Sequence, residues 1–170
     1  MRKIRAAMTA AALLLVGQAM AADDSQPYAL KESDPVTGTA IKKKRVTGSV
    51  PLNLRYEKMT PEQQAVVRSA YDDMPADDEP PFPADGLETV MKGLMKASQK
   101  FNARGLVDLA VEVGPDGAAR SVSAYALPDD EEFRQFALRL VMITRYKPAV
   151  CGGKPCVMSW PLRMNIELEH

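Results

Sequence analysis

Apolar and polar residues alternate in two stretches of the C-terminal half, and this period of two predicts β-strands with one buried face. In the first stretch, from Val107 to Val113, valine and leucine occupy every second position. The second stretch runs from Met158 to Leu168 and alternates almost without interruption, with Trp160 among its apolar residues. We therefore expect two strands whose apolar side chains face a common core.

The residues after the first strand predict a hairpin. Residues 114–117 read Gly-Pro-Asp-Gly, in which proline presets φ and glycine accepts a positive φ, so the chain turns back. Residues 118–127 form the expected returning strand, with Val122 and Ala124 as its buried residues.

A helix is expected after this hairpin. The acids from Asp129 to Glu132 open it, at the end where the helix dipole favours negative charge. Its apolar residues recur at helical spacing, and they are Phe133, Phe136, Ala137, Leu140 and Val141. Arg145 and Lys147 lie near the expected C-terminus, and Pro148 should end the helix because proline cannot continue it.

Two further helices are predicted upstream. Thr60, Pro61 and Gln63 have the spacing of a capping box with proline at the first helical position, which predicts a short helix over 60–74. Its apolar stripe consists of Val66, Val67, Ala70 and Tyr71. A longer helix is expected from Asp85, with Glu88 as its capping partner, and its apolar face consists of Leu87, Val90, Met91, Leu94, Met95 and Phe101. The acidic, proline-rich residues 75–84 predict an exposed linker.

Together these elements predict an α+β fold. We expect an antiparallel sheet of three strands, or slightly more, with two helices packed on one face and a short N-terminal helix in addition. The main domain spans 85–168, and 22–59 forms a polar N-terminal extension. The basic run Lys42 to Arg45 in that extension is interpreted as a solvated segment. Residues 169–170 resemble the start of an affinity tag.

Residues 1–21 predict an export signal that is cleaved after Ala21. Arg2, Lys3 and Arg5 precede an apolar stretch, and Ala19-Met20-Ala21 is a small-x-small cleavage site. The uncharged run ends at Asp23 and is short for a membrane span of about 20 residues. Three of the 22 Lys and Arg residues lie in this signal, so 19 remain against 22 acids. A mildly acidic mature protein argues against general binding to nucleic acid or to anionic membranes.

Cys151 and Cys156 are the only cysteines, and a Gly-Gly-Lys-Pro loop separates them. In an exported protein this pattern predicts a structural disulfide. The alternative is a metal or redox pair, but no histidine or acidic cluster flanks the cysteines and the spacing is not Cys-x-x-Cys.

No candidate catalytic, metal or cofactor site emerges from the sequence. The single histidine is the last residue, His170, which leaves no histidine base or histidine metal site inside the domain. The acids from Asp129 to Glu132 lie at a helix N-terminus, where capping suits them better than proton transfer. We therefore expect a protein that is not an enzyme and needs no cofactor.

Several of these segments resemble the TonB C-terminal domain. The likeness lies in residues 105–107, in the strand and turn over 111–117, and in Arg-Tyr-Lys-Pro at 145–148 before the Cys-Gly-Gly-Lys-Pro loop. Upstream, Pro81-Phe82-Pro83 is similar to the Tyr-Pro segment that usually precedes that domain. The resemblance implies a periplasmic module of the Gram-negative envelope that serves transport by binding a peptide, such as a segment of a TonB-dependent outer-membrane receptor.

In domains of this family the final strand is a sheet edge to which the partner adds a strand. Carried onto this chain, the resemblance gives a partner-binding set of Phe82, Pro83, Ser159, Arg163, Asn165 and Glu167. Pro161 favours an edge position, since proline cannot donate to a ladder, and the partner should pair best from Arg163 onward.

The chain departs from TonB proper in its N-terminal part, which has a cleavable signal without histidine and only a short linker. These departures predict a periplasmic binding module and not a complete energy transducer. Two alternatives stay open: a self-associating protein that dimerises through the final strand, and a transducer that keeps its N-terminal anchor.

Overall fold

The computed structural model describes residues 50–167. The predicted export signal, the basic run and the final residues 168–170 lie outside this range. In chain order the elements are η1 (Tyr56–Lys58), α1 (Pro61–Arg68), β1 (Phe82–Pro83), α2 (Glu88–Phe101), β2 (Gly105–Val113), β3 (Ala119–Ala126), α3 (Glu131–Ile143), β4 (Tyr146–Lys147), β5 (Ala149–Cys151), β6 (Lys154–Cys156) and β7 (Met158–Ile166).

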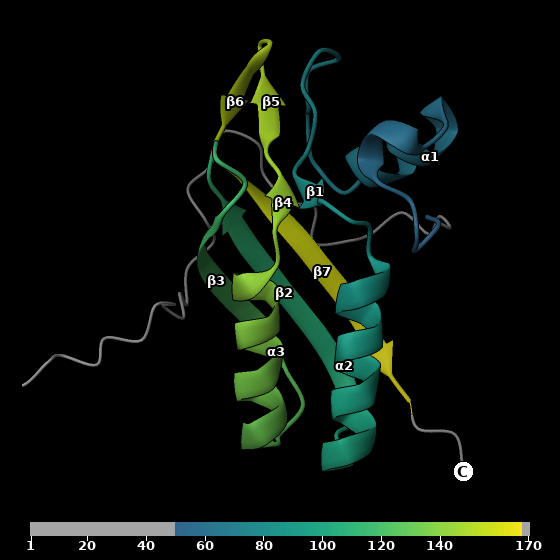
Figure 1. Ribbon diagram of the computed structural model, residues 1–170, viewed down its shortest axis with the longest axis vertical. Helices are drawn as coiled ribbons and strands as arrows, with labels where there is room; N and C mark the ends of the chain where they lie inside the picture. Colours follow the sequence, from purple (N-terminus) through teal and green to yellow (C-terminus); the bar gives the residue numbers. More distant parts are fainter. Residues whose placement is uncertain (1–49, 168–170) are drawn as a thin grey trace, which may run out of the picture.

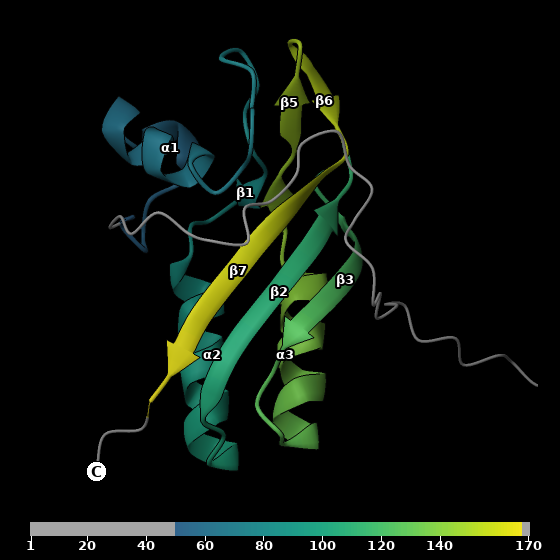
Figure 2. The same cartoon turned by 180° about the vertical axis from the view of Figure 1, so that it is seen from behind.

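The main sheet is antiparallel and has the strand order β3-β2-β7, so β2 is its central strand. In this register Val111 lies opposite Val122 of β3 and Trp160 of β7. Helices α2 and α3 lie side by side on one face of the sheet (Figure 1), and the opposite view shows the three strands in front of both helices (Figure 2). The expected α+β class, with helices on an antiparallel three-stranded sheet, is confirmed.

The core forms between β2 and the two helices. The alternation in β2 turns four residues toward the helices, and none of them is exposed to solvent: Val107, Leu109, Val111 and Val113. They contact buried residues that recur at helical spacing in α2 and α3, among them Val90, Leu94, Phe133, Ala137 and Val141. The apolar area that this packing removes from water is the main stabilising contribution to the domain.

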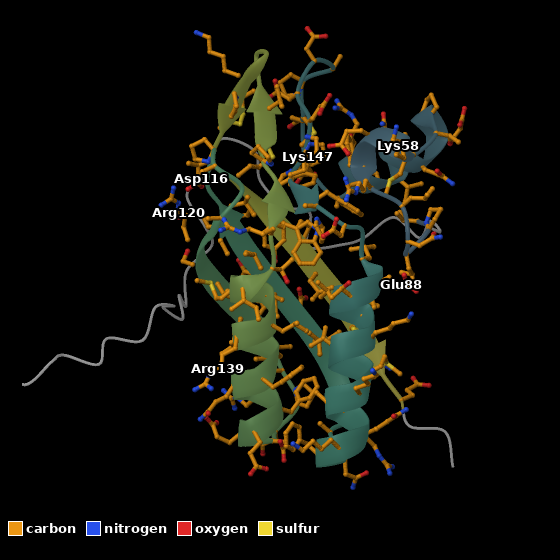
Figure 3. All side chains as sticks on the ribbon, viewed as in Figure 1. Lys58, Glu88, Asp116, Arg120, Arg139 and Lys147 are labelled. Carbon is orange, nitrogen blue, oxygen red and sulfur yellow. A yellow bond between two sulfur atoms is a disulfide. The ribbon has the colours of Figure 1, made fainter. Side chains whose placement is uncertain are left out.

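The turn between β2 and β3 is closed by its own backbone and by a carboxylate. Gly117 N–H donates to Gly114 O at 2.9 Å, and Asp116 accepts from Ala118 N–H at 3.2 Å. Asp116 also pairs with Arg120 at 3.0 Å, and Figure 3 shows the two side chains together at this turn. The Ala118 N–H, followed by the Arg120 charge, lowers the pKa of Asp116. The turn thus has the form that its Gly-Pro-Asp-Gly sequence predicts.

The start of α2 differs from the prediction. The helix begins at Glu88 and not at Asp85, and it has no side-chain cap. Asp85 pairs instead with Arg55 at 2.6 Å, and Gly86, with φ +85, turns the chain out of the helical path. Glu88 N–H donates to Leu52 O, so the upstream segment satisfies a helix terminus that the sequence assigned to a capping box.

The end of α3 also differs. The helix stops at Ile143, well before Pro148, because Thr144 takes an extended conformation and Tyr146 and Lys147 form β4. Phe136, expected on the apolar face, is exposed to 37 %. Strand pairing between β4 and β1, which the sequence pattern of the helix does not reveal, therefore decides where α3 ends.

The segment before α2 is only partly the exposed linker that its composition predicts, because residues 75–77 are exposed but the residues that follow are not. Residues 80–83 are buried, and Phe82 and Pro83 form β1, paired with β4. Proline is compatible with this place because β1 pairs on one side only in the described part of the chain. Composition alone indicates a linker, but the burial of Phe82 draws this segment into the domain.

The close approach of the β2–β3 turn to β4 gives a testable prediction. Gly117 has φ +74, and a Cβ there would lie 2.2 Å from Tyr146 O, whereas Gly152, with φ +54, has open space around it. We expect Gly117→Ala to lower the free energy of unfolding by roughly 2–5 kcal/mol, the sum of left-handed strain and overpacking. Gly152→Ala should cost about 1–2 kcal/mol, the strain alone. Urea denaturation of both variants measures this difference, and equal losses would contradict it.

Candidate functional site

The candidate site lies along the free side of β7. Among the described residues β7 pairs with β2 alone, so its other side is a sheet edge. Tyr71 OH donates to Ser159 O at 2.9 Å, which shows that the Ser159 carbonyl points away from β2. Because backbone direction alternates along a strand, Pro161, Arg163 and Asn165 face the same way as Ser159. Pro161 therefore faces away from β2, and its missing N–H leaves no acceptor of β2 without a donor.

A groove of about 250 Å³ follows this edge. One wall comes from Val66 and Val67 of α1 and from the turn of residues 69–71, and the other from residues 160–163 of β7. Phe82, Leu87 and Met91 also line it. We call this set of residues the edge groove. Most of its side chains are apolar, so it suits a chain segment that carries an apolar residue.

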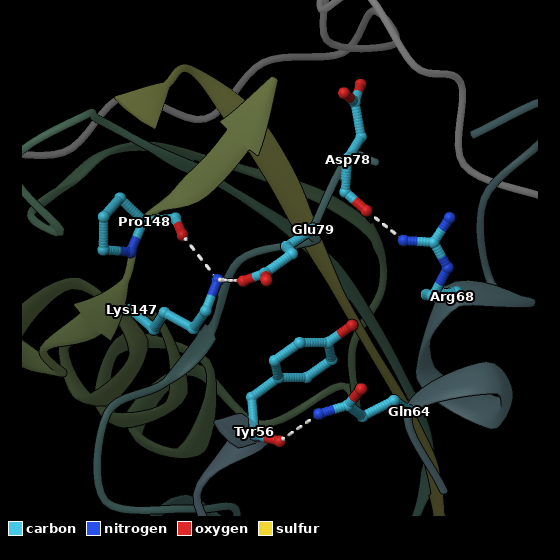
Figure 4. Close-up of polar contacts among 7 residues, drawn as sticks. All are labelled: Tyr56, Gln64, Arg68, Asp78, Glu79, Lys147 and Pro148. Atoms are coloured by element: carbon cyan, nitrogen blue, oxygen red, sulfur yellow. Dashed lines mark hydrogen bonds and ion pairs between the residues drawn. The ribbon is translucent and has the colours of Figure 1, made fainter. Parts of the chain in front are cut away.

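Helix α1 owes its position to capping and to polar contacts. Thr60 and Gln63 form the capping box that the sequence indicates. Gln64 donates to Tyr56 O at 3.0 Å, and Arg68 donates to the carbonyls of Asp78 and Pro75. Figure 4 shows the bond of Gln64 to the Tyr56 carbonyl and the bond of Arg68 to the Asp78 carbonyl. These bonds fix α1 beside β7 although α1 has no buried residue of its own.

A second part of the same network joins the acidic segment to β4. Lys147 Nζ lies 2.8 Å from Glu79 Oε2, donates to Pro148 O at 3.1 Å and lies 5.1 Å from the centre of the Tyr56 ring (Figures 3 and 4). The Lys147 side chain is mostly buried, so its charge is compensated inside this cluster by Glu79 and by the ring face.

Tyr71 lines the edge groove and bonds to β7. Helix α1 ends at Arg68, so Tyr71 lies in the turn after it and not on the helical stripe that the sequence predicts. Its side chain is 3 % exposed and packs against Ala149 and Met158. Burial raises the pKa of Tyr71 well above its ordinary value. The hydroxyl is therefore protonated near neutral pH and acts as the donor to Ser159 O.

The structure brings Phe82 of the predicted set next to β7. The Phe82 side chain is buried and lines the edge groove together with residues 160–163. Pro83 is buried as well, and it lies opposite Tyr146 in β1. Of this predicted pair, only Phe82 reaches the groove.

The predicted residues of β7 have different surroundings. Ser159 is buried and its carbonyl is taken by Tyr71. Arg163 lies opposite Asp108 of β2, with Nε 3.5 Å from Asp108 Oδ2. Asn165 is exposed, and its amide donates to Glu167 at 2.7 Å. Of the outward-facing residues of β7, Ser159 has its carbonyl bonded to Tyr71, and Asn165 is an exposed one near the C-terminal end.

The α1 wall is the part of the site that sequence reasoning missed. Val66, Val67, Ala70 and Tyr71 appear in the sequence as a short apolar stripe. The stripe indicates that this face of α1 packs on something, but it does not identify β7 as the neighbour. Trp160, expected in the core, is 3 % exposed there and also lines the groove.

Cys151 and Cys156 form the predicted disulfide and close the β5–β6 hairpin. No group of three or more His, Cys, Asp or Glu residues within 50–167 is arranged to hold a metal ion. In that same range, no helix has the length and apolarity to cross a bilayer.

Comparison of the chain with protein-family models, with curated proteins and with solved structures found no match. We therefore infer function from the geometry of β7 and the edge groove.

Tyr71→Phe tests the hydrogen bond from the Tyr71 hydroxyl to the Ser159 carbonyl. The variant leaves the Ser159 carbonyl without its donor, and we expect a loss of about 1–2 kcal/mol in the free energy of unfolding at pH 7. Because burial raises the pKa of Tyr71, its contribution is intact below the ordinary tyrosine pKa of about 10 and is lost as the pH rises beyond it. The variant should therefore lose less stability than the wild type as the pH rises above about 10. Urea denaturation across this range measures both effects, and unchanged stability at pH 7 would contradict the assignment.

Proposed function

We propose that this protein is a non-enzymatic periplasmic binding module that takes up an extended peptide by adding it as a strand to β7. The peptide class favoured by the resemblance to TonB C-terminal domains is a segment of a TonB-dependent outer-membrane receptor. The single observation that carries the proposal is that β7 pairs with β2 only, within the described residues, while the edge groove follows its other side.

The proposed mechanism uses backbone and side chains for different purposes. The outward N–H and C=O groups at the C-terminal end of β7 bind the peptide backbone, which gives affinity with little dependence on sequence. Alternate peptide side chains point toward the helix layer, where the edge groove receives an apolar one between α1 and β7. Selectivity then comes from the residue that enters the groove.

Two features set the register of the added strand. Tyr71 occupies the Ser159 carbonyl, and Pro161 offers no N–H. A peptide therefore gains few hydrogen bonds along the first half of β7 and more from Asn165. The apolar residue of the peptide must lie a few positions from the residue that pairs with Asn165, because the part of β7 that lines the groove is residues 160–163.

Asn165→Pro and Asn165→Ala form a matched pair that tests the proposal. Both remove the side chain, but only proline removes the outward N–H. With a panel of synthetic peptides from the N-terminal segments of TonB-dependent receptors, we expect Asn165→Pro to weaken binding about five- to tenfold, the contribution of one backbone hydrogen bond. Asn165→Ala should bind as the wild type does. Fluorescence of Trp160, the only tryptophan and a groove residue, reports binding in titrations.

N-methylation of the peptide gives an independent test of strand addition. Methyl groups on alternate peptide nitrogens should abolish binding, and methyl groups on the nitrogens between them should leave it intact, because only every second N–H faces β7. Weakening without this alternation would overturn strand addition. If no receptor peptide binds and light scattering shows a dimer, self-association through β7 replaces the proposal.

A further inference from the structure

The α1 wall of the edge groove has little support of its own. Helix α1 contains no buried residue. Gln64 and Val67 hold it against the segment around Tyr56, and the contacts at its C-terminal end join it to residues 75–78 and to β7. Arg68 donates to carbonyls of the segment 75–78, and Tyr71 anchors the following turn to β7. Elements with few buried apolar contacts are the ones that open most readily. The shape of the groove therefore depends also on the contacts that hold residues 71–79 in place.

Residues 78 and 79 are attached to the β5–β6 hairpin. Asp78 Oδ1 accepts from Gly152 N–H at 2.9 Å. Glu79 and Val150 exchange two backbone hydrogen bonds, at 2.8 and 2.9 Å. The carbonyl of the same Asp78 accepts from Arg68. One short segment therefore touches the hairpin on one side and the end of α1 on the other.

The hairpin in turn depends on its disulfide. Strands β5 and β6 have three residues each. In the described part of the chain they pair with each other, and Val150 adds one bridge to Glu79. So small a sheet is marginal in water without further support. Cys151 and Cys156 join the two strands and also pack against the buried cluster of Tyr71, Ala149 and Met158. The disulfide thus joins the hairpin strands and packs against the cluster that contains Tyr71, a lining residue of the groove.

We propose that the Cys151–Cys156 disulfide is a redox switch for the edge groove: the oxidised protein holds α1 against β7, and the reduced protein releases it. The reductant is a dithiol. Its thiolate attacks one cysteine sulfur, the protein S–S bond breaks, and a mixed disulfide forms. The second thiol of the dithiol then displaces the other protein thiol, so the dithiol is oxidised to a disulfide and the two cysteines leave as protonated thiols.

Reduction removes the cross-link of the hairpin that bonds Asp78 through Gly152 and Glu79 through Val150. These bonds weaken, while the ion pair of Glu79 with Lys147 stays in place. The loss passes to α1 through Arg68 and to β7 through Tyr71. The central strand β2 is not part of this chain of contacts. The coupling concerns the shape of the groove and goes beyond the proposed function, because it holds whatever peptide the groove receives.

Hydrogen exchange of the full chain, with and without dithiothreitol and without any peptide, tests the switch. Reduction should speed amide exchange in residues 61–79 about tenfold, the factor expected for loss of roughly one net hydrogen bond, and should leave β2 unchanged. The double variant Cys151→Ser/Cys156→Ser should exchange at the reduced rate in both conditions, which excludes a direct effect of the dithiol. Faster exchange in 149–156 with unchanged exchange in 61–79 would overturn the coupling.

Asp78→Asn supplies a variant with its disulfide intact. It weakens the acceptor of Gly152 N–H and should speed exchange in 61–79 in the oxidised state, with a smaller further response to dithiothreitol than the wild type shows. A full wild-type response in this variant would contradict a path through Asp78. If receptor peptides fail to bind while the exchange of 61–79 still responds to reduction, the switch stands and strand addition to β7 falls.

Discussion

The domain depends on the double pairing of β2. This strand is hydrogen-bonded to β3 on one side and to β7 on the other, and its alternate residues form the centre of the core beneath α2 and α3. A three-stranded open sheet with a fully paired central strand necessarily has two edges. The elements added around this unit make the two edges different, because α1, β1 and the β5–β6 hairpin all lie near β7 or the connection that precedes it (Figure 1).

The elements whose signal is local follow closely from the sequence. Alternation places β2 and β7 correctly, Gly-Pro-Asp-Gly gives the turn, and Asp130 caps α3 with a 2.7 Å bond to Phe133 N–H. The errors arise where a distant segment satisfies the backbone. Leu52 replaces the predicted cap of α2, and β1 ends α3 by pairing with β4. Neither contact leaves a pattern within the residues it affects.

The candidate site was predictable only along β7. A strand with a proline is visible in the sequence, and so is a closely spaced pair of cysteines. The groove needs Tyr71 to meet Ser159, 88 positions away in sequence, and it needs α1 to lie beside Trp160. Periodicity gives the face of a helix that is apolar, but it does not say which partner that face meets. The sequence therefore shows the apolar stripe of α1 but not the surface that the stripe meets.

Pro161 has a consequence for the behaviour of the protein in a crowded compartment. An uninterrupted edge would template the stacking of copy upon copy, the first step toward fibrils. A ring without an N–H in the middle of β7 breaks that template, and the Tyr71 hydroxyl covers the carbonyl next to it. The surface that we propose as the acceptor of a short guest strand is thereby a poor seed for aggregation.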